Sequence, residues 1–179
     1  MYILVVVDMQ KCWPEANNPA TIKAVKQQIK KAIRRNCPVI SVTIPYFSTM
    51  DAKGYPPMLK CLSRLLKGYG KHRTVCKGLC DDGAGQVLYA AEELFPSKGT
   101  KKLRLCGVKT AACLWAMVQG LCKRAGVKVN VVRNACHSLV GLVADPSGMT
   151  PAVQSDIAWQ PSMWGFFEQL PNVRLISGR

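Results

Sequence analysis

The chain has 179 residues, of which 49% are hydrophobic, and these values predict one compact domain over residues 1–179. No apolar stretch approaches the roughly 18 residues of a membrane span, and residues 1–7 lack the basic flank and cleavage pattern of a signal peptide, so neither a membrane span nor secretion is expected. The formal net charge of +15 should attract polyanions, although charge alone specifies no partner.

Predicted strands and helices alternate along the chain. Apolar runs of strand length occupy residues 2–7, 39–44, 73–76, 103–106, 127–132 and 173–176, and segments of helical period occupy residues 20–35, 58–66, 85–95, 111–125 and 159–170. This order predicts an α/β class protein, a three-layer α/β/α Rossmann-like domain with a mainly parallel sheet. Sites in such sheets lie at the carboxyl ends of the strands, and the Pro-, Gly- and Ser-rich segments 45–57 and 144–161 are predicted loops that could rim the site.

The first predicted helix, residues 20–35, carries a large share of the positive charge. Its apolar positions Ile22, Val25, Ile29 and Ile33 follow a helical period, so its basic residues are best interpreted as a solvated face. The helix lacks the interleaved aromatic residues of many nucleic-acid surfaces, and no nucleic-acid-binding motif is present. A nucleic-acid partner therefore stays an alternative without support from a motif.

The cysteines indicate a reducing compartment. There are nine of them, an odd number without a regular framework, and several lie inside apolar runs where a free thiol behaves as a small hydrophobe. We therefore expect a cytoplasmic protein without a disulfide framework.

Three polar side chains follow predicted strands at separate places in the chain: Asp8, Lys77 and Cys113. A carboxylate, an ammonium and a thiol at one edge of a parallel sheet can activate the thiol as a nucleophile. Each residue also has an ordinary interpretation. Asp8 could be a turn residue, Lys77 a surface lysine and Cys113 a packed core cysteine, and only their combination predicts an enzyme.

The surroundings of Cys113 predict a reactive thiol. If Thr110 caps the following helix, Cys113 lies in its first turn, where unpaired N–H groups and the helix dipole lower the pKa of a thiol. A nearby Lys77 ammonium would lower the pKa further, and the same N–H groups could hold an oxyanion. The buried face of this predicted helix consists of Leu114, Met117, Val118, Leu121 and Cys122.

The motifs Asp8-Met9-Gln10 and Gly107-Val108-Lys109-Thr110-Ala111-Ala112-Cys113, with Lys77 between them, resemble the isochorismatase-like cysteine hydrolases. This superfamily includes nicotinamidases, carbamoylsarcosine amidases and ureidoacrylate amidases. The order and approximate spacing of elements match over nearly the whole chain, and the glycine-to-cysteine motif is the most specific part.

The resemblance implies a catalytic triad of Asp8, Lys77 and Cys113, in which Asp8 takes the thiol proton and later returns it to the leaving nitrogen while Lys77 orients the pair. It also implies a non-proline cis peptide bond at Val108-Lys109 and an oxyanion hole formed by the backbone N–H groups of Lys109 and Cys113. Trp13 corresponds to an aromatic residue that could stack on a planar substrate, or it packs at the rim. Relatives form dimers and tetramers, so a homo-oligomer is expected.

Departures from the family pattern concern the metal and the substrate. Nicotinamidases hold a metal through an aspartate and several histidines, whereas this chain has Asp51 in that region and only His72 and His137 in total, so neither a metal nor another cofactor is expected. Arg133 stands where many relatives carry an acidic residue, and together with Lys109 it makes an anionic substrate conceivable. Asp81 and Asp82, which follow Lys77, are interpreted as helix caps or as polar groups of the pocket.

The sequence thus predicts a cysteine hydrolase that cleaves a C–N bond of a small amide or carbamoyl compound through a thioester acyl-enzyme, without a metal. The alternative is a catalytically silent member of the superfamily that binds nucleic acid or an acidic partner. Thiol redox chemistry ranks third, because Cys76 and Cys80 lack the spacing of a redox pair.

Overall fold

The computed structural model describes residues 1–44, 57–78, 82–96, 99–138, 143–144, 151–152 and 164–178. Its strands are β1 (Ile3–Val7), β2 (Val39–Thr43), β3 (His72–Cys76), β4 (Lys101–Val108), β5 (Val127–His137), β6 (Val143–Ala144), β7 (Pro151–Ala152) and β8 (Val173–Ile176). Its helices are α1 (Pro19–Arg34), α2 (Lys60–Leu66), α3 (Ala84–Leu94) and α4 (Trp115–Cys122), with a 3-10 turn η1 (Pro14–Asn17), a π-helical segment η2 (Thr110–Leu114) and a further helix over residues 164–169.

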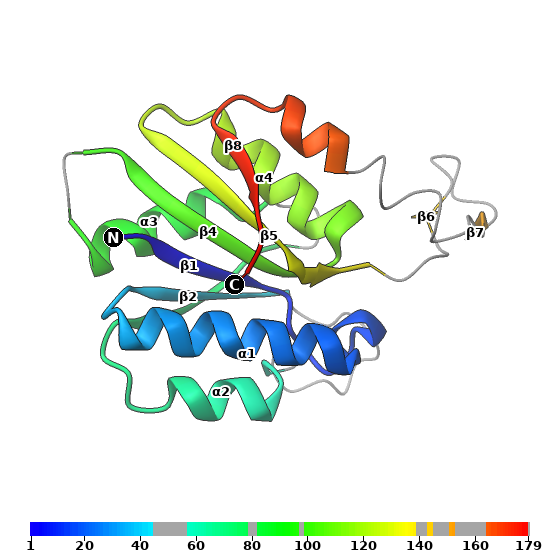
Figure 1. Ribbon diagram of the computed structural model, residues 1–179, viewed down its shortest axis with the longest axis horizontal. Coiled ribbons are helices and arrows are strands. Elements are labelled where there is room, and N and C mark those ends of the chain that lie inside the picture. Colours follow the sequence, from blue (N-terminus) through cyan, green and yellow to red (C-terminus); the bar gives the residue numbers. More distant parts are fainter. Residues whose placement is uncertain are drawn as a thin grey trace.

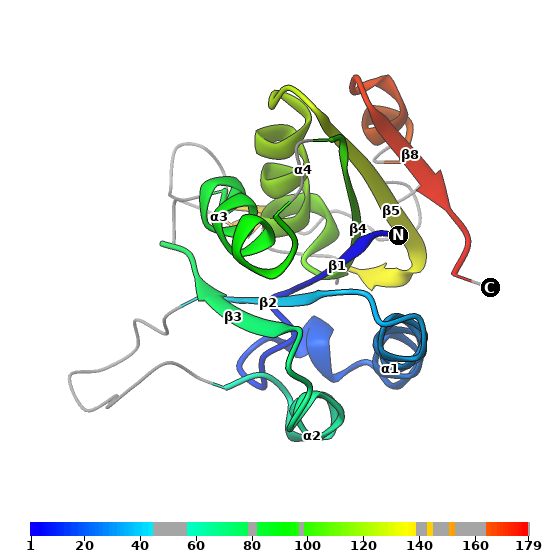
Figure 2. The same cartoon turned by 90° about the vertical axis from the view of Figure 1, so that its left-hand side faces the viewer.

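Six strands form one sheet in the order β3-β2-β1-β4-β5-β8, and each neighbouring pair is parallel. Helices α1 and α2 cover one face of the sheet, and α3 and α4 cover the other (Figures 1 and 2). Helix 164–169 packs on the side of α4, since the rings of Phe167 and Trp115 meet edge to face at 4.9 Å between centroids. The predicted three-layer α/β/α architecture is confirmed. The short strands β6 and β7 pair with each other in antiparallel orientation.

The most apolar sequences form the centre of the sheet. Every residue of β1 (ILVVV) and β2 (VISVT) is buried, as expected for strands covered by helices on both faces. The edge strand β3 is largely exposed, and its pattern is correspondingly polar. Helix α1 begins where Asn18 accepts a hydrogen bond from the Thr21 N–H at 3.0 Å and Pro19 takes the first helical position, a favourable start for a helix.

Several predicted elements differ from the observed ones in bounds or type. The predicted helix 111–125 is instead η2 followed by α4, because the chain leaves β4 through a wider π-helical turn before α-helical pairing begins at Trp115. Strand β5 is longer than predicted and reaches His137, with an irregular register opposite Leu105 and Gly107. The predicted helix 159–170 is observed over residues 164–169, and its earlier part lies outside the described residues.

Most of the two predicted loops, at residues 45–57 and 144–161, lies outside the described residues, and so does Asp51. In the described part of the chain, no helix is both long enough and apolar enough to cross a membrane.

Candidate functional site

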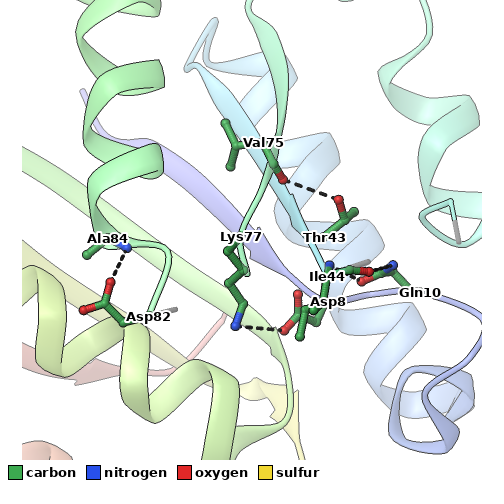
Figure 3. Close-up of polar contacts among 8 residues, drawn as sticks. All are labelled: Asp8, Gln10, Thr43, Ile44, Val75, Lys77, Asp82 and Ala84. Atoms are coloured by element: carbon green, nitrogen blue, oxygen red, sulfur yellow. Dashed lines mark hydrogen bonds and ion pairs between the residues drawn. The ribbon is translucent and has the colours of Figure 1, made fainter. Parts of the chain in front are cut away.

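Asp8, Lys77 and Cys113 come from different parts of the sequence and meet at the carboxyl edge of the sheet. Asp8 follows β1, Lys77 follows β3, and Cys113 lies in η2 just after β4. The parallel pairing extends beyond the strands, because the Asp8 N–H donates to the Val42 carbonyl at 3.0 Å and the Lys77 N–H donates to the Thr43 carbonyl at 3.1 Å. These bonds align the ends of β1 and β3 with the end of β2, and β4 pairs with β1 up to Val7 and Gly107. Figure 3 shows the Lys77 side chain reaching toward the Asp8 carboxylate.

The backbone at Asp8 turns sharply out of the sheet. Asp8 has φ +50°, in the left-handed region that aspartate adopts more readily than most residues. Gly107 on the neighbouring strand has φ +123°, and a Cβ atom there would lie 2.1 Å from the Val7 carbonyl oxygen. Only glycine therefore permits β4 to pass this close to the turn that carries Asp8.

Asp8 and Lys77 form a buried ion pair. The Lys77 Nζ lies 3.8 Å from Asp8 Oδ2, and the side chains are 2% and 1% exposed, respectively. This separation exceeds an ordinary hydrogen bond. The stem of Lys77 packs against Gly83, where a Cβ atom would lie 2.9 Å from Lys77 Cδ, so the start of α3 holds the lysine in place.

The protonation of Asp8 follows from its burial. Loss of solvent raises the pKa of Asp8 from 3.8 to about 6, although the ammonium of Lys77, contact with the Cys113 thiol and the charge of Lys109 all lower it. No hydrogen bond of ordinary length reaches either carboxylate oxygen within the described residues. At neutral pH Asp8 is therefore an ionised but poorly solvated carboxylate, which favours proton acceptance.

The expected low pKa of Cys113 is wrong. Burial, with a smaller contribution from the Asp8 carboxylate, raises the pKa of the Cys113 thiol to about 11, and the opposing effects of Lys77 and of a backbone hydrogen bond from Lys109 are smaller. The structural reason is that the thiol is half-buried against a carboxylate. Cys113 is therefore a thiol at neutral pH, and its activation requires a base.

The segment before Cys113 contains the predicted cis peptide bond between Val108 and Lys109. The predicted cap at Thr110 is wrong, because η2 begins after Lys109 without a side-chain cap, and the Thr110 hydroxyl is buried with no hydrogen-bond partner among the described residues. The N–H groups of Ala112 and Leu114 both donate to the Lys109 carbonyl, at 3.1 and 3.0 Å. The turn thus winds around Lys109. Leu114 and the other predicted core positions of this helix are buried as expected.

Gln10 supports the turn that carries Asp8. Its side-chain amide donates to the Ile44 carbonyl at 3.0 Å and accepts from the Ile44 N–H at 2.8 Å (Figure 3). This pair of bonds fixes the chain after β1 to the end of β2. The Asp-Met-Gln motif therefore combines a buried carboxylate with a residue that positions it.

Lys109 and Trp13 belong to a cluster that also includes Glu15. The Lys109 Nζ lies 3.6 Å from Glu15 Oε1 and 4.7 Å from the centroid of the Trp13 ring. The prediction of site residues did not include Glu15. The available signal was a lone acidic residue in a long basic region, since no other Asp or Glu occurs between Asp8 and Asp51.

The other residues singled out in the sequence lie elsewhere or serve the fold. Arg133 is exposed, and its guanidinium lies 5.3 Å from the centroid of the Trp164 ring. Asp82 accepts a hydrogen bond from the Ala84 N–H at 2.7 Å, as predicted for a residue at the start of α3 (Figure 3). His72 begins β3, the opposite end from Lys77, and bonds to Ser41 at 2.9 Å. His137 pairs with Val108 at the carboxyl end of β5. Asp81 lies outside the described residues.

No group of three or more His, Cys, Asp or Glu side chains is arranged to hold a metal within the part of the chain that the structure describes.

Comparison with known proteins identifies the fold. The chain matches no protein-family model and no curated protein sequence. Its structure resembles an isochorismatase from Pseudomonas putida KT2440 (TM-score 0.68, 16% identity, 99% of this chain and 88% of that one) and the N-carbamoylsarcosine amidase from Thermoplasma acidophilum (0.65, 14%, 99% and 97%). It also resembles the MAR1 ribonuclease from Caenorhabditis elegans (0.64, 17%, 99% and 77%).

The chain therefore has the isochorismatase-like fold, as the motifs around Asp8 and Cys113 predicted. At these identities the similarity shows the fold, whereas the chemistry depends on the residues of the site.

Proposed function

We propose that this protein is an isochorismatase-like cysteine hydrolase that cleaves the C–N bond of a small amide or carbamoyl compound. The observation that supports this most strongly is the buried ion pair of Asp8 with Lys77 at the carboxyl edge of the sheet, where β1 pairs with β4, the strand that leads into the segment of Cys113. A carboxylate that is 1% exposed costs free energy, and such groups concentrate where chemistry requires them.

In the proposed first half-reaction, Asp8 accepts the Cys113 proton as the sulfur attacks the substrate carbonyl carbon. Backbone N–H groups of Lys109 and Cys113 stabilise the oxyanion, as preorganised donors do in other acyl transfers. Asp8 then gives the proton to the leaving nitrogen, the C–N bond breaks, and a thioester forms on Cys113. Lys77 stabilises the negative charge on Asp8 and on the sulfur.

In the second half-reaction, Asp8 accepts a proton from water, which attacks the thioester carbonyl carbon. Collapse of the tetrahedral intermediate breaks the C–S bond, releases the carboxylic or carbamic acid, and returns the proton to Cys113. This order fits the charges of the resting site, because the pKa of Asp8, about 6, leaves the base ionised, and the pKa of Cys113, about 11, leaves the proton on sulfur.

The direct test is ammonia or amine release from a panel of small amides, comparing the wild type with Cys113→Ser. We expect the variant to lose activity by about 10³-fold or more. The matched control is Cys61→Ser on α2, a partly buried thiol that should leave the activity unchanged. Full activity in Cys113→Ser would refute the proposed nucleophile.

We further propose a cytoplasmic location and assembly into a homo-oligomer. The eight cysteines within the described residues are all free thiols, which suits a reducing compartment. The assembly rests on the resemblance alone, and size-exclusion chromatography with light scattering tests it directly.

A second candidate function is binding of nucleic acid by the layer that α1 and α2 form. These helices contain seven lysine and arginine residues and no acidic one. Both cover the same face of the sheet (Figure 2). A dense single-sign surface of this kind attracts phosphate backbones independently of sequence, and this candidate does not require an active Cys113.

A further inference from the structure

We propose that the Lys109 ammonium, held between Glu15 and the Trp13 ring, binds an anionic group of the substrate. The substrate class is then an amide or carbamoyl compound that carries a carboxylate. This inference rests on the proposed function. It assigns substrate recognition to the side chain of Lys109, the residue directly before η2, the segment that carries Cys113.

Lys109 is adjacent to the reacting groups by two independent observations. Its carbonyl accepts hydrogen bonds from the N–H groups of Ala112 and Leu114, the residues on either side of Cys113, at 3.1 and 3.0 Å. Its positive charge also acts on Asp8, whose pKa it lowers. An anionic substituent of a substrate at Cys113 would therefore lie in the field of the Lys109 ammonium.

Two contacts restrain the Lys109 side chain. Glu15 Oε1 lies 3.6 Å from the Nζ atom on one side, and the Trp13 ring lies 4.7 Å from it. A lysine held in this way loses less side-chain entropy when it binds a ligand than a free surface lysine does. The Lys109 side chain is nevertheless 34% exposed, so part of the ammonium can still meet a ligand.

Glu15 has little other reason to be buried. Its side chain is 8% exposed, its second oxygen has no hydrogen-bond partner among the described residues, and Lys109 is the cation that these residues place against it. Burial of a carboxylate with one long contact is unfavourable unless the arrangement serves a purpose. Glu15 is therefore a positioning residue that acts through Lys109.

This arrangement changes the role of Trp13. The sequence left open whether the ring stacks on a planar substrate or packs at the rim, and in the structure one of its faces meets the Lys109 ammonium. A cation over an indole face is a favourable contact. Trp13 thus orients Lys109, and recognition of the substrate depends on charge.

The test uses two small alkylating reagents that differ in charge, iodoacetate and iodoacetamide. In both reactions the Cys113 sulfur displaces iodide, and peptide mass spectrometry gives the rate at Cys113. The ratio of the iodoacetate rate to the iodoacetamide rate reports the preference of the site for an anion. The common requirement for deprotonation of Cys113 cancels in this ratio, and Cys61 in the same molecule serves as an internal reference.

We expect Lys109→Met to lower the ratio at Cys113 by about five- to tenfold, because a nearby charge is removed. Lys109→Arg should retain it within about twofold, whereas Glu15→Gln should raise it by about two- to fivefold, because Lys109 loses its counter-charge. The ratio at Cys61 should not change in any variant. A merely structural Lys109–Glu15 pair would change stability without moving the ratio.

An unchanged ratio in Lys109→Met would overturn the inference. If that variant does not fold, Glu15→Gln decides, and an unchanged or lowered ratio there has the same meaning. The outcome is separable from the proposed function. A lowered ratio in a protein without amidase activity contradicts hydrolysis only, and amidase activity with an unmoved ratio contradicts anion recognition only.

Discussion

Asp8 combines two properties that oppose each other. Its burial raises the pKa to about 6, and the ammonium of Lys77, 3.8 Å away, limits this rise. A carboxylate balanced in this way is ionised at neutral pH yet is a stronger base than an exposed aspartate. Both conditions are needed if Asp8 is to accept a proton from the Cys113 thiol, whose pKa is raised to about 11.

The raised pKa of Asp8 predicts a pH dependence of the reaction. The rate constant kcat/KM should fall as the pH decreases through about 6, because Asp8 becomes protonated below its raised pKa and can no longer accept the thiol proton. Above that pH the carboxylate is fully available. Initial rates between about pH 4.5 and 8 measure this acidic limb of the pH–rate profile. On the plateau above the limb, Asp8→Asn should reduce the rate by about 10²- to 10⁴-fold.

Two variants provide the control for assigning this limb to Asp8. Lys77→Met and Lys109→Met each remove a charge that lowers the pKa of Asp8, so both should move the limb to higher pH. The shift should be larger for Lys77→Met, because Lys77 has the stronger effect. A limb that stays in place in both variants belongs to another group.

Single residues show how far the sequence could predict the candidate site. The positions of Asp8, Lys77 and Cys113 were predictable, because each follows a strand and parallel strands end at one edge. The raised pKa of Cys113 was not predictable, because it depends on burial beside Asp8. Glu15 was equally hidden, since its contact with Lys109 joins residues that are far apart in the chain.

Among the elements, the carboxyl ends of β1 and β4 determine where η2, the segment that carries Cys113, can lie. Val7 pairs with Gly107, and the next residues on the two strands are Asp8 and Val108, the residue before the cis peptide. The close approach at Gly107 brings the turn at Asp8 and the segment η2 together. It also makes this pair of strands intolerant of any side chain at that point.

The second prediction concerns Gly107. Gly107→Ala should lower the free energy of unfolding by about 3 to 5 kcal/mol, since the new Cβ atom would meet the Val7 backbone and the residue would have to keep a positive φ. Urea denaturation followed by circular dichroism measures the change. Gly85→Ala in the first turn of α3 is the matched control, because a Cβ atom there meets nothing within 4 Å.

For Gly85→Ala we expect a gain of roughly 0.5 to 1 kcal/mol, the usual effect of alanine in place of glycine within a helix. Equal destabilisation of both variants would show that the Gly107 contact is not special.

The elements differ in how well periodicity predicted them. Strand β8 was predicted with its observed bounds, and α1 within one residue at each end, because Val173–Ile176 is an isolated apolar run and α1 has a regular buried stripe. Segment η2 was missed, because a π-helical turn has no separate hydrophobic period and its sequence continues into α4. The departure from regular structure coincides with the candidate nucleophile.

Across the described part of the molecule, the two helical layers differ in charge. Helices α1 and α2 contain no acidic residue, whereas the acidic side chains Asp82, Glu92, Glu93 and Glu168 belong to the layer on the opposite face. The seven lysine and arginine residues of α1 and α2 therefore give this layer an excess of positive charge. If nucleic acid binds, it should bind to the α1/α2 layer.

The final prediction tests that surface by the salt dependence of binding. A fluorescent single-stranded RNA of about 20 nucleotides, titrated by anisotropy in roughly 20 to 200 mM salt, should bind more weakly as salt rises, because each phosphate contact releases counterions. The triple variant Lys23→Gln, Lys30→Gln and Arg64→Gln removes three exposed charges of the layer. We expect it to reduce the slope of log K against log salt by about 2.

The matched control is a second triple variant, Lys123→Gln, Arg124→Gln and Lys128→Gln, which removes the same net charge from exposed positions near the end of α4 and the start of β5. If the whole-molecule charge attracts RNA without a defined surface, both triple variants should lower the slope equally. If the α1/α2 layer is the contact surface, the control should retain most of the slope. No measurable binding at the lowest salt would exclude the nucleic-acid candidate and leave the basic helices as a solvated face.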